Sequence, residues 1–353
     1  MECNECYCDG SDTYEDPMQP DTIVITGMSG NFAAADNTLQ FYESLCNKKL
    51  YFRISTGITR RQSNSMDPAF RLLLERVFEA IIDGGYSPSE FVDTNTGVFA
   101  SCGILETERG VFYEELNHFS DAITGAQRSL MAKLISYHFK LKSLSFQVDA
   151  ACCGSLFALE HAYVAIKEGK CDKAIVCGEN LCLQPSLSLE LARLGVASRD
   201  GKSKTFDNTV DGYARSEAVV VLLLERATDA KRVYAEVVHV KTSCDGYKIE
   251  GITFPNIYQK KQMMLDFYNE CNIDRKTISF VEAHGTGTAV GDREELNCMD
   301  EVMCQDRKDP LYIGAVKSNL GHTEAASGIC SIVKVIRYLS QIYFVVHSSE
   351  KEN

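Results

Sequence analysis

The sequence lacks the features that mark several large classes of protein. It has no excess of basic residues, because 36 Lys and Arg stand against 49 Asp and Glu, giving a formal net charge of −13. A nucleic-acid-binding protein carries a basic patch or stripe, so this balance argues against that class. No segment approaches the ~18 apolar residues that a membrane-spanning helix needs. We therefore expect neither nucleic acid nor membrane among the partners.

The N-terminus also lacks a secretory signal, because residues 1–21 are acidic and polar. We expect these residues to form a disordered tail. The tail contains Cys3, Cys6 and Cys8, but no histidine lies nearby to complete a four-ligand metal site. Flexible thiols are the simpler interpretation, and we expect no metal.

Cysteine, by contrast, is abundant, with 15 residues in a chain of 353. Several cysteines lie singly in apolar stretches, namely Cys102, Cys177, Cys182 and Cys330. Isolated apolar positions are typical of buried free thiols in a reducing compartment rather than of a disulfide framework. The protein is therefore predicted to be cytoplasmic. Metal or redox binding through the cysteines is an alternative that a metal assay would test.

Hydrophobic periodicity predicts strands that alternate with helices from Thr22 onwards. Such alternation implies helices layered on sheets, which is an α/β fold. The predicted helices lie at 36–47, 67–84, 124–140, 154–167, 258–272, 294–303 and 328–339. The predicted strands lie at 23–28, 96–101, 144–149, 173–177, 218–224, 234–243, 278–282 and 311–316.

Two of these elements have clear end signals. Asp67 can cap the helix at 67–84, Pro68 suits its first turn, and a glycine pair at 84–85 would end it. The strand at 23–28 is predicted to end in a glycine turn at Gly27.

Three motifs follow predicted strands, and the first carries a cysteine. In Val148–Leu156, with the sequence VDAACCGSL, a strand runs into a turn of small residues and then into a helix. This arrangement places Cys152 on a sharp turn at a helix N-terminus, where the helix dipole lowers the pKa of a thiol and favours the reactive thiolate. A single cysteine is more often simply buried, so this motif alone does not establish a nucleophile.

The second motif is Val281–Thr288, with the sequence VEAHGTGT, in which a strand leads His284 into a loop of alternating Gly and Thr. The glycines allow close backbone approach, and the hydroxyls can bind a polar ligand arm. A phosphate-binding loop is the competing interpretation. That loop ends in Gly-Lys-Ser/Thr, which is absent here.

The third motif is Ile313–His322, with the sequence IGAVKSNLGH, which again begins in a strand and carries Lys317 and His322. A histidine alone at such a position would be read as structural. One cysteine and two histidines, each on a strand-end turn, are much harder to explain by packing alone. Together they indicate a catalytic site.

The segments DAACCGSL, EAHGTGTAVGD and KSNLGHTEAASG resemble the three signature motifs of the β-ketoacyl synthase family, in that family's order and at about its spacing. Three other segments agree: MDPAFRLLLE, RDGKSKTFDNTVDGYARSEA and DGYKIEGITFP. The last two most resemble animal-type fatty acid synthase. The resemblance covers roughly residues 22–339.

This resemblance implies the thiolase-like fold, in which two similar halves pack as a layered αβαβα structure. Residues 22–245 would form the N-terminal half with the nucleophile. Residues 246–353 would form a partial C-terminal half with both histidine motifs. The family is usually a homodimer, and the strand beside the nucleophile, at 144–149, would lie at its interface.

The resemblance also implies the chemistry. Cys152 would accept an acyl chain from the phosphopantetheine arm of an acyl carrier protein. His284 and His322 would donate to the malonyl thioester oxygen during decarboxylative condensation, which yields a 3-oxoacyl product. Thiolases use a second cysteine in place of this histidine pair, so condensation is favoured over thiolysis. Acyl and malonyl thioesters would be the substrates, and no permanently bound cofactor is expected.

Four further residues match supporting positions of the family. Lys317 would support the charge network of the site, with Glu295 as its acidic partner. Thr286 and Thr288 would line the channel for the pantetheine arm.

The sequence departs from the family pattern in ways that leave alternatives open. The Thr two residues before the nucleophile is Ala150, and two serines after it are Cys153 and Gly154. The stretch at 47–66 is shorter than usual by roughly forty residues.

The departure at the C-terminal end is the most serious. Residues 343–353 do not resemble the family, and its closing strands, with their glycine-rich Phe turn, are absent. In the family that turn supplies an oxyanion-hole amide, and loss of one such donor typically costs ~10²–10³ in rate. A non-catalytic or truncated scaffold and dimerisation module is therefore one alternative to fatty acid synthesis. A polyketide synthase condensing domain is another, because the same motifs serve both pathways.

Overall fold

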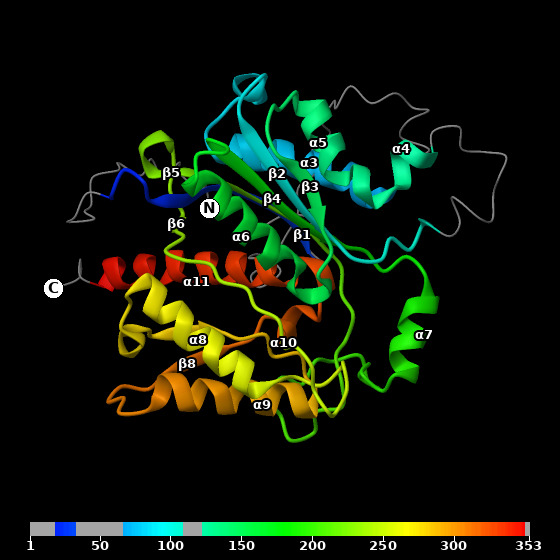
Figure 1. The fold of residues 1–353 in the computed structure, drawn as a ribbon, viewed down its shortest axis with the longest axis vertical. Coiled ribbons are helices and arrows are strands. Elements are labelled where there is room, and N and C mark those ends of the chain that lie inside the picture. The colour runs from blue at the N-terminus through cyan, green and yellow to red at the C-terminus, as the bar shows by residue number, and fades with distance from the viewer. Residues whose placement is uncertain (1–17, 33–65, 109–121, 350–353) are drawn as a thin grey trace.

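The computed structural model describes residues 18–32, 66–108 and 122–349 as a layered α/β structure (Figure 1). Most of the predicted tail at 1–21 lies outside the described residues. The same holds for the helix predicted at 36–47 and for nearly all of the short stretch at 47–66.

A six-stranded sheet forms the centre of the first half, with the strand order β3-β2-β4-β5-β1-β6. Its central strands are almost wholly buried, as their uninterrupted apolar sequences require. Strands β2, β3 and β4 run parallel, and β5 and β1 are antiparallel to their neighbours. The strands are β1 (Ile23–Phe32), β2 (Thr96–Cys102), β3 (Ser145–Val148), β4 (Lys173–Asn180), β5 (Ala218–Arg226) and β6 (Ala235–Glu236).

Helices cover both faces of this sheet. Helices α3 (Pro68–Asp83) and α5 (Met131–Phe139) pack on one face, and α6 (Gly154–Lys167) and α11 (Ser327–Ser349) pack on the other. Alternate residues of β5 serve the two faces, since side chains point to opposite sides of a strand. The side chains of Val219, Val221 and Leu223 join the α3 cluster, and those of Val220, Leu222 and Leu224 join the α6 and α11 cluster.

A second, parallel sheet follows in the later part of the described chain. Its strands are β7 (Phe280–Glu282) and β8 (Tyr312–Gly314). Helices α8 (Ile257–Cys271) and α9 (Ala289–Met299) cover its outer side through a third apolar cluster.

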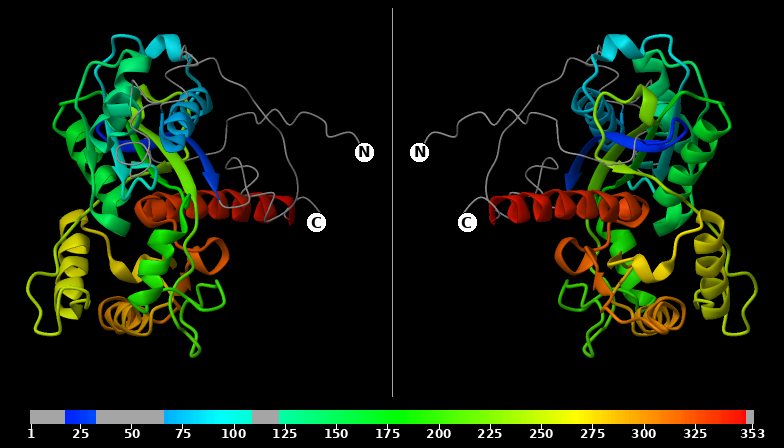
Figure 2. Two further views of the ribbon diagram at one scale, coloured as in Figure 1. Left: turned by 90° about the vertical axis from the view of Figure 1, so that its right-hand side faces the viewer. Right: turned by 90° about the vertical axis from the view of Figure 1, so that its left-hand side faces the viewer.

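Helix α11 lies between the two sheets (Figure 2). Its residues Ile329 and Val333 belong to the core of the first sheet. On the other side, Lys334 forms an ion pair of 2.6 Å with Glu282 of β7, and Tyr338 stacks on Phe280. The order helix, sheet, helix, sheet, helix confirms the predicted layered αβαβα architecture.

The remaining elements are short and connect these layers. They are the α-helices α4 (Ala122–Ala126), α7 (Pro185–Arg193) and α10 (Lys317–Leu320), the 3₁₀ turns Pro88–Phe91, Arg128–Leu130, Ala151–Cys153, Ala227–Asp229, Arg275–Thr277 and Glu324–Ala326, and the π-helical turn Asp300–Cys304. Among the described residues, no helix combines the length and the apolar character that crossing a bilayer requires.

The predicted end signals of α3 are confirmed. The Asp67 carboxylate accepts a hydrogen bond of 2.6 Å from the Ala69 amide, Pro68 occupies the first turn, and Gly84 caps the C-terminus. The helix predicted at 154–167 has the same bounds in α6.

The glycine turn predicted at Gly27 is wrong, because β1 continues through a bulge to Phe32. A Cβ on Gly27 would lie 2.1 Å from the Ala80 carbonyl oxygen of α3. The glycine therefore lets the helix backbone approach the strand closely, and it makes no turn.

Two other predictions differ from the structure, and one helix has no counterpart among the predictions. The helix predicted at 124–140 is divided, since α4 ends at Ala126 and α5 begins at Met131. The strand predicted at 234–243 pairs with β1 only in β6. Beyond β6 the chain turns to α6, where the Tyr163 hydroxyl donates to the Val238 carbonyl at 3.0 Å. Helix α7 was not predicted.

Substituting Gly27→Ala should lower the thermal unfolding midpoint of the chain, because the added methyl overlaps the α3 backbone. Overpacking of this kind typically costs about 1–3 kcal/mol. Gly103→Ala is the matched control, since its Cβ would meet nothing closer than the Ala325 Cβ at 3.9 Å. Equal midpoints for the two variants in a calorimetric scan would contradict the assignment of Gly27 to helix–strand packing.

Candidate active site

Cys152 lies on the turn between edge strand β3 and helix α6. The strand ends at Val148, and the 3₁₀ turn leads directly into the helix. Ala151 has a φ of 48°, in the left-handed region, which a residue other than glycine enters only at a cost. The Ser327 hydroxyl at the start of α11 donates to the Cys152 carbonyl at 3.0 Å. The Cys152 turn is thus strained and is held by the helix that lies between the two sheets.

Gly154, one of the departures from the family pattern, has a packing role here. A Cβ on Gly154 would lie 2.2 Å from the Ser101 hydroxyl of β2, so the turn sits directly against the sheet. The same hydroxyl donates to the Ala325 carbonyl at 3.1 Å. One serine therefore contacts both the Cys152 turn and the segment that follows His322.

His284 comes from the loop after β7, and two carboxylates of α9 hold the backbone of this loop. The two Glu295 oxygens accept hydrogen bonds from the amides of His284 and Gly285 at 2.7 and 2.8 Å. Asp292, which is buried, accepts one from the Gly287 amide at 3.0 Å. The negative charges are thus directed at the main chain and away from the imidazole.

His322 follows α10, and its position is set by main-chain contacts. Its amide donates to the Ala214 carbonyl at 2.7 Å, and its carbonyl accepts from the Ser216 amide at 2.9 Å. The Glu324 amide donates to the His322 Nδ1 at 3.1 Å. A nitrogen that accepts a hydrogen bond carries no proton, so the neutral ring bears its proton on Nε2.

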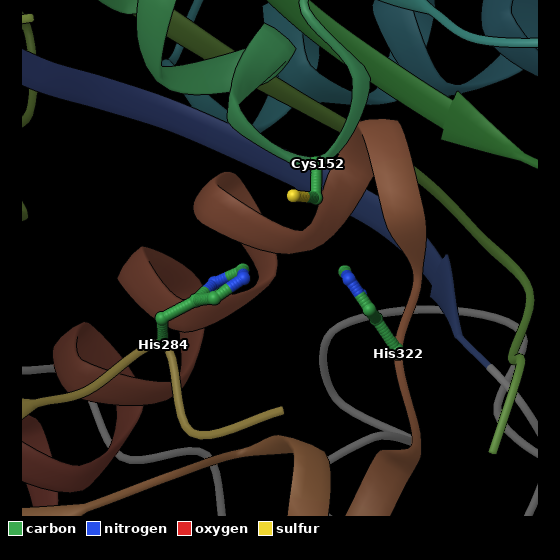
Figure 3. Close-up of side chains that lie close together, drawn as sticks. All are labelled: Cys152, His284 and His322. Carbon is green, nitrogen blue, oxygen red and sulfur yellow. The ribbon is translucent and has the colours of Figure 1, made fainter. Parts of the chain in front are cut away.

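The structure brings these three side chains together (Figure 3). The Cys152 sulfur and one ring nitrogen of each histidine all lie within 4.8 Å of one another. The two imidazole centroids are 5.5 Å apart, with the rings nearly perpendicular at 87°. These donor types also suit Zn²⁺, so a metal assay belongs with any test of the site.

Lys317 supplies the buried positive charge of the site and is 2% exposed. Burial lowers the pKa of both histidines, and the Lys317 charge lowers it further. The His284 residue is exposed, yet its pKa is lowered as the pKa of His322 is. Both imidazoles are therefore neutral at pH 7, and each retains one N–H donor.

The Lys317 ammonium is itself destabilised by burial, which lowers its pKa, while negative charge at Cys152 and Glu295 opposes that shift. The Glu295 oxygens are hydrogen-bonded to amides. The predicted pairing of Glu295 with Lys317 is therefore a through-space attraction.

Cys153 changes the acid–base behaviour of its neighbour. The hydrogen bond from Cys152 lowers the pKa of the exposed Cys153 thiol to about 7. The same bond, together with burial, raises the pKa of Cys152. The expected lowering of the Cys152 pKa by the helix end is therefore wrong for the free chain, in which Cys153 is the residue at the N-cap of α6.

The other singled-out residues occupy less specific positions. Thr286 and Thr288 are half-buried, with their hydroxyls 3.1 Å apart. The cysteines in the described ranges are free. Three of the four predicted as buried thiols are buried, and Cys182 is half-buried.

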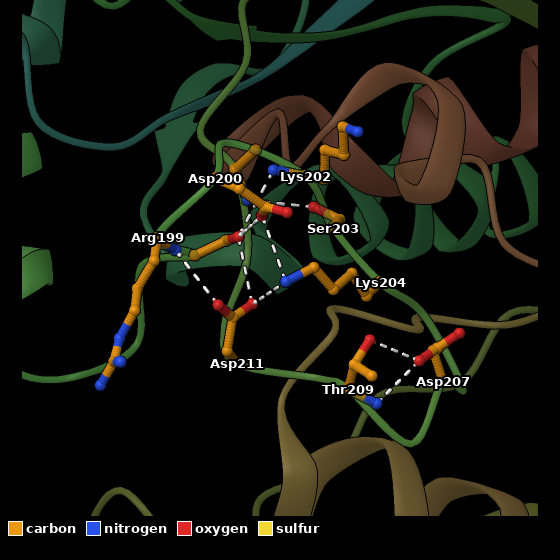
Figure 4. A network of polar contacts seen from close by, with 10 residues as sticks. Arg199, Asp200, Lys202, Ser203, Lys204, Asp207, Thr209 and Asp211 are labelled. Atoms are coloured by element: carbon orange, nitrogen blue, oxygen red, sulfur yellow. Dashed lines mark hydrogen bonds and ion pairs between the residues drawn. The ribbon is translucent and has the colours of Figure 1, made fainter.

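Residues 198–216 form a loop between α7 and β5, and the resemblance of this segment to the family predicts no role for its residues. Asp211 organises the loop (Figure 4). Its carboxylate accepts hydrogen bonds from the Lys204 ammonium at 3.0 Å, the Ser198 hydroxyl at 3.2 Å and the Arg199 amide at 3.4 Å. A surplus of short polar residues and glycines was the only local signal.

This loop is bonded to both histidine loops. The Thr205 hydroxyl donates to the Gly285 carbonyl at 2.7 Å, and the Gly212 amide donates to the Gly287 carbonyl at 2.9 Å. Three residues further on, Arg215 forms the bridge to His322. Its conformation therefore sets the relative placement of both imidazoles.

Comparison with known proteins gives a consistent result. The family profile for the β-ketoacyl synthase N-terminal domain matches residues 53–230, and that for the C-terminal domain matches residues 234–347. The second match includes part of the stretch at 343–353 that was expected not to resemble the family, so that expectation is wrong as far as residue 347.

Relatives occur in two kinds of synthase. A fatty acid synthase from Anser anser anser is 39% identical over 342 residues, covering 89% of this chain and 97% of that protein. A highly reducing polyketide synthase from Alternaria alternata is 34% identical over 273 residues, covering 76% of this chain and 9% of that protein.

Solved structures agree with the fold. The ketosynthase from module 6 of the bacillaene synthase of Bacillus subtilis 168 superposes with a TM-score of 0.80 at 28% identity, covering 91% of this chain. An oxazolomycin ketosynthase domain from Streptomyces albus gives 0.79 at 27% identity, covering 90%. The chain spans 61% and 62% of the lengths of these two domains.

Alkylation with iodoacetamide should modify Cys153 before Cys152 at pH 7. The rate at Cys153 should rise with pH around its pKa of about 7, because the thiolate is the reactive form. Cys153→Ser should remove the neighbouring thiolate and shift alkylation of Cys152 to lower pH. Peptide mass spectrometry across a pH series measures both rates. An unchanged Cys152 profile in the variant would contradict the coupling, and Cys244, which is also exposed, serves as the internal reference.

Proposed function

Because this chain belongs to the β-ketoacyl synthase family, we propose that it elongates an acyl chain by decarboxylative condensation with a malonyl thioester. The observation that carries this proposal is that the Cys152 sulfur and one ring nitrogen of each histidine lie within 4.8 Å of one another. Neutral rings suffice for the role, because each still carries one N–H that it can donate. Burial and the Lys317 charge favour that neutral state in both.

In the first step, the Cys152 sulfur attacks the carbonyl carbon of an acyl thioester. The new carbon–sulfur bond replaces the bond to the incoming thiol, and that thiol leaves with the proton of Cys152. The Cys153 hydrogen bond and burial raise the pKa of Cys152, and the positive charge of Lys317 opposes that shift in favour of the ionised thiol. The acyl chain is then bound to Cys152 as a reactive thioester.

In the second step, the malonyl thioester loses CO₂. Its carbon–carboxylate bond breaks, and the electron pair moves onto the thioester oxygen as an enolate. N–H groups of His284 and His322 would stabilise that oxygen as its charge develops. The enolate carbon then attacks the Cys152 thioester, a carbon–carbon bond forms, and Cys152 leaves as a thiolate that is reprotonated from solvent.

We assign delivery of both thioesters to the phosphopantetheine arm of an acyl carrier protein. Thr286 and Thr288 lie on the His284 loop, where their hydroxyls can bind the amides of such an arm. No permanently bound cofactor takes part in either step. A cytoplasmic location would fit the free cysteines, which persist in a reducing compartment.

Fatty acid synthesis is the pathway we favour, since the fatty acid synthase relative has 39% identity over 89% of this chain. Polyketide synthases match over a smaller share of it, such as the 76% covered by the relative from Alternaria alternata. Unbranched saturated acyl thioesters are therefore the acyl donors to test first.

The purified chain should become labelled at Cys152 when it is incubated with a radiolabelled acyl-pantetheine thioester. Peptide mass spectrometry locates the label, and Cys152→Ala should remove it. His322→Ala should retain labelling but lose malonyl decarboxylation, by about 10²–10³-fold if the ring acts as an oxyanion donor.

Cys153→Ser is the matched control, because it keeps the nucleophile and removes only the adjacent thiol. Metal analysis of the same sample tests the zinc alternative. A folded sample that takes no label at Cys152 would overturn the enzymatic proposal and leave a ketosynthase-derived scaffold.

We also propose that the chain forms a homodimer through β3. This strand lies at the edge of the sheet, and among the described residues it pairs only with β2. Leu144 and Phe146 are 40% and 36% exposed there. An apolar pocket of about 170 Å³ opens beside them, lined in part by His161 and Val164. An exposed edge of this kind is suited to pairing with a second copy.

Phe146→Glu should shift the chain from dimer to monomer in light scattering after size-exclusion chromatography, because a charge would be buried in the pairing surface. Ile252→Glu is the control, since Ile252 is 93% exposed and lies outside that surface. A native chain that is monomeric at all concentrations would refute the proposed dimer.

A further inference from the structure

Arg215 carries a nearly buried cation, and its side-chain partners lie outside the proposed reaction centre, although its main chain forms the bridge to His322. Its side chain is 7% exposed and has three partners. Nε lies 2.7 Å from a Glu324 carboxylate oxygen, one terminal nitrogen lies 2.8 Å from Glu106, and the other donates to the Ser188 hydroxyl at 3.1 Å. The guanidinium is therefore bound on several sides.

The partners of Arg215 come from distant parts of the chain. Glu106 lies just after β2, and its second oxygen accepts a hydrogen bond of 2.5 Å from the Gln184 amide. Ser188 belongs to α7, and Glu324 opens the 3₁₀ turn after His322. Arg215 thus joins the half that carries Cys152 to the segment that carries the second histidine.

Glu324 is held in an unfavourable backbone conformation at this point. Its φ of 40° lies in the left-handed region, which costs a residue other than glycine about 1 kcal/mol or more. In this conformation its amide donates to Nδ1 of His322 at 3.1 Å. Two nitrogens of Arg215 donate hydrogen bonds to the carboxylate oxygens of the same residue, at 2.7 and 3.4 Å. The ion pair is the contact that can hold this conformation.

We propose that Arg215 is a positioning residue for His322. By fixing the Glu324 carboxylate it keeps the Glu324 amide on Nδ1, and so keeps the ring proton on Nε2. The imidazole then offers its N–H to the reaction centre. This inference rests on the proposed function for its effect on turnover, but the tautomer it assigns can be measured without turnover.

Arginine suits this position better than lysine. Its planar group presents several donors in a fixed fork, and it serves two carboxylates and a hydroxyl at once here. A lysine ammonium could face either Glu106 or Glu324 well, but not both with the same geometry. Removal of the cation would leave two carboxylates largely buried without a counter-charge, with side-chain exposures of 3% and 23%.

Nitrogen-15 NMR of the imidazoles tests the proposal in the full chain. The native protein should show His322 with its proton on Nε2, identified by loss of that signal in His322→Ala. Arg215→Met should give a mixture of tautomers and lower malonyl decarboxylation by about 10²-fold, as expected for a misplaced donor. Acylation of Cys152 should fall much less. Arg215→Lys should restore part of both signals.

Two controls separate positioning from general loss of structure. Glu106→Gln removes one ion pair but keeps the Arg215–Glu324 contact, so the His322 tautomer should stay native. Arg193→Met removes an exposed arginine and should change nothing. If Arg215→Met does not fold, Glu324→Gln is the second variant, which weakens the same contact without removing the cation.

The proposal fails if a folded Arg215→Met or Glu324→Gln variant keeps the native tautomer. It also fails if Glu106→Gln perturbs the tautomer as strongly as Arg215→Met does. Failure of the proposed function gives a different result, because the tautomer shift would then appear in a chain that shows no acylation of Cys152.

Discussion

Hydrogen bonds from one irregular loop hold the candidate site together. Residues 198–216 bind the His284 loop through Thr205 and Gly212 and bind His322 through the Arg215 bridge. The two histidines are far apart in the sequence and belong to different loops of the second sheet. A common partner that contacts both is the simplest way to fix their relative positions. Much of the remaining structure, including the buried sheet, supports this loop.

The electrostatics of the site depend on where the acidic groups point. Glu295 and Asp292 lie close to His284, yet their oxygens accept hydrogen bonds from main-chain amides. A carboxylate on the imidazole itself would raise its pKa and favour the charged ring. With the acids engaged elsewhere and Lys317 nearby, both rings remain neutral. The acidic residues of the site thus hold the loop backbone, and the Lys317 charge acts on the two imidazoles.

Much of the fold was predictable because the central strands are long apolar runs and α3 has clear caps. The three strand-end turns were predictable for the same reason. The bulge at Gly27 and the break between α4 and α5 were missed, since tertiary contacts decide them. The left-handed conformations of Ala151 and Glu324 have no sequence signal. The contacts of the loop at 198–216 join residues that are distant in sequence, which local patterns do not encode. The roles of the site residues and the division of the chain at 245 stay predictions.

Helix α11 gives the molecule a property that concerns its synthesis. The six-stranded sheet is complete once β6 has left the ribosome, but one of its faces packs partly on Ile329 and Val333 of α11. Until that late helix is made, part of the apolar surface of the first half has no cover, and the Cys152 turn lacks the Ser327 hydroxyl that binds its carbonyl. Nascent chains therefore carry a sheet with an open face, and such intermediates are prone to aggregation. The complete site and the cover of the first half therefore form together, when α11 has been synthesised.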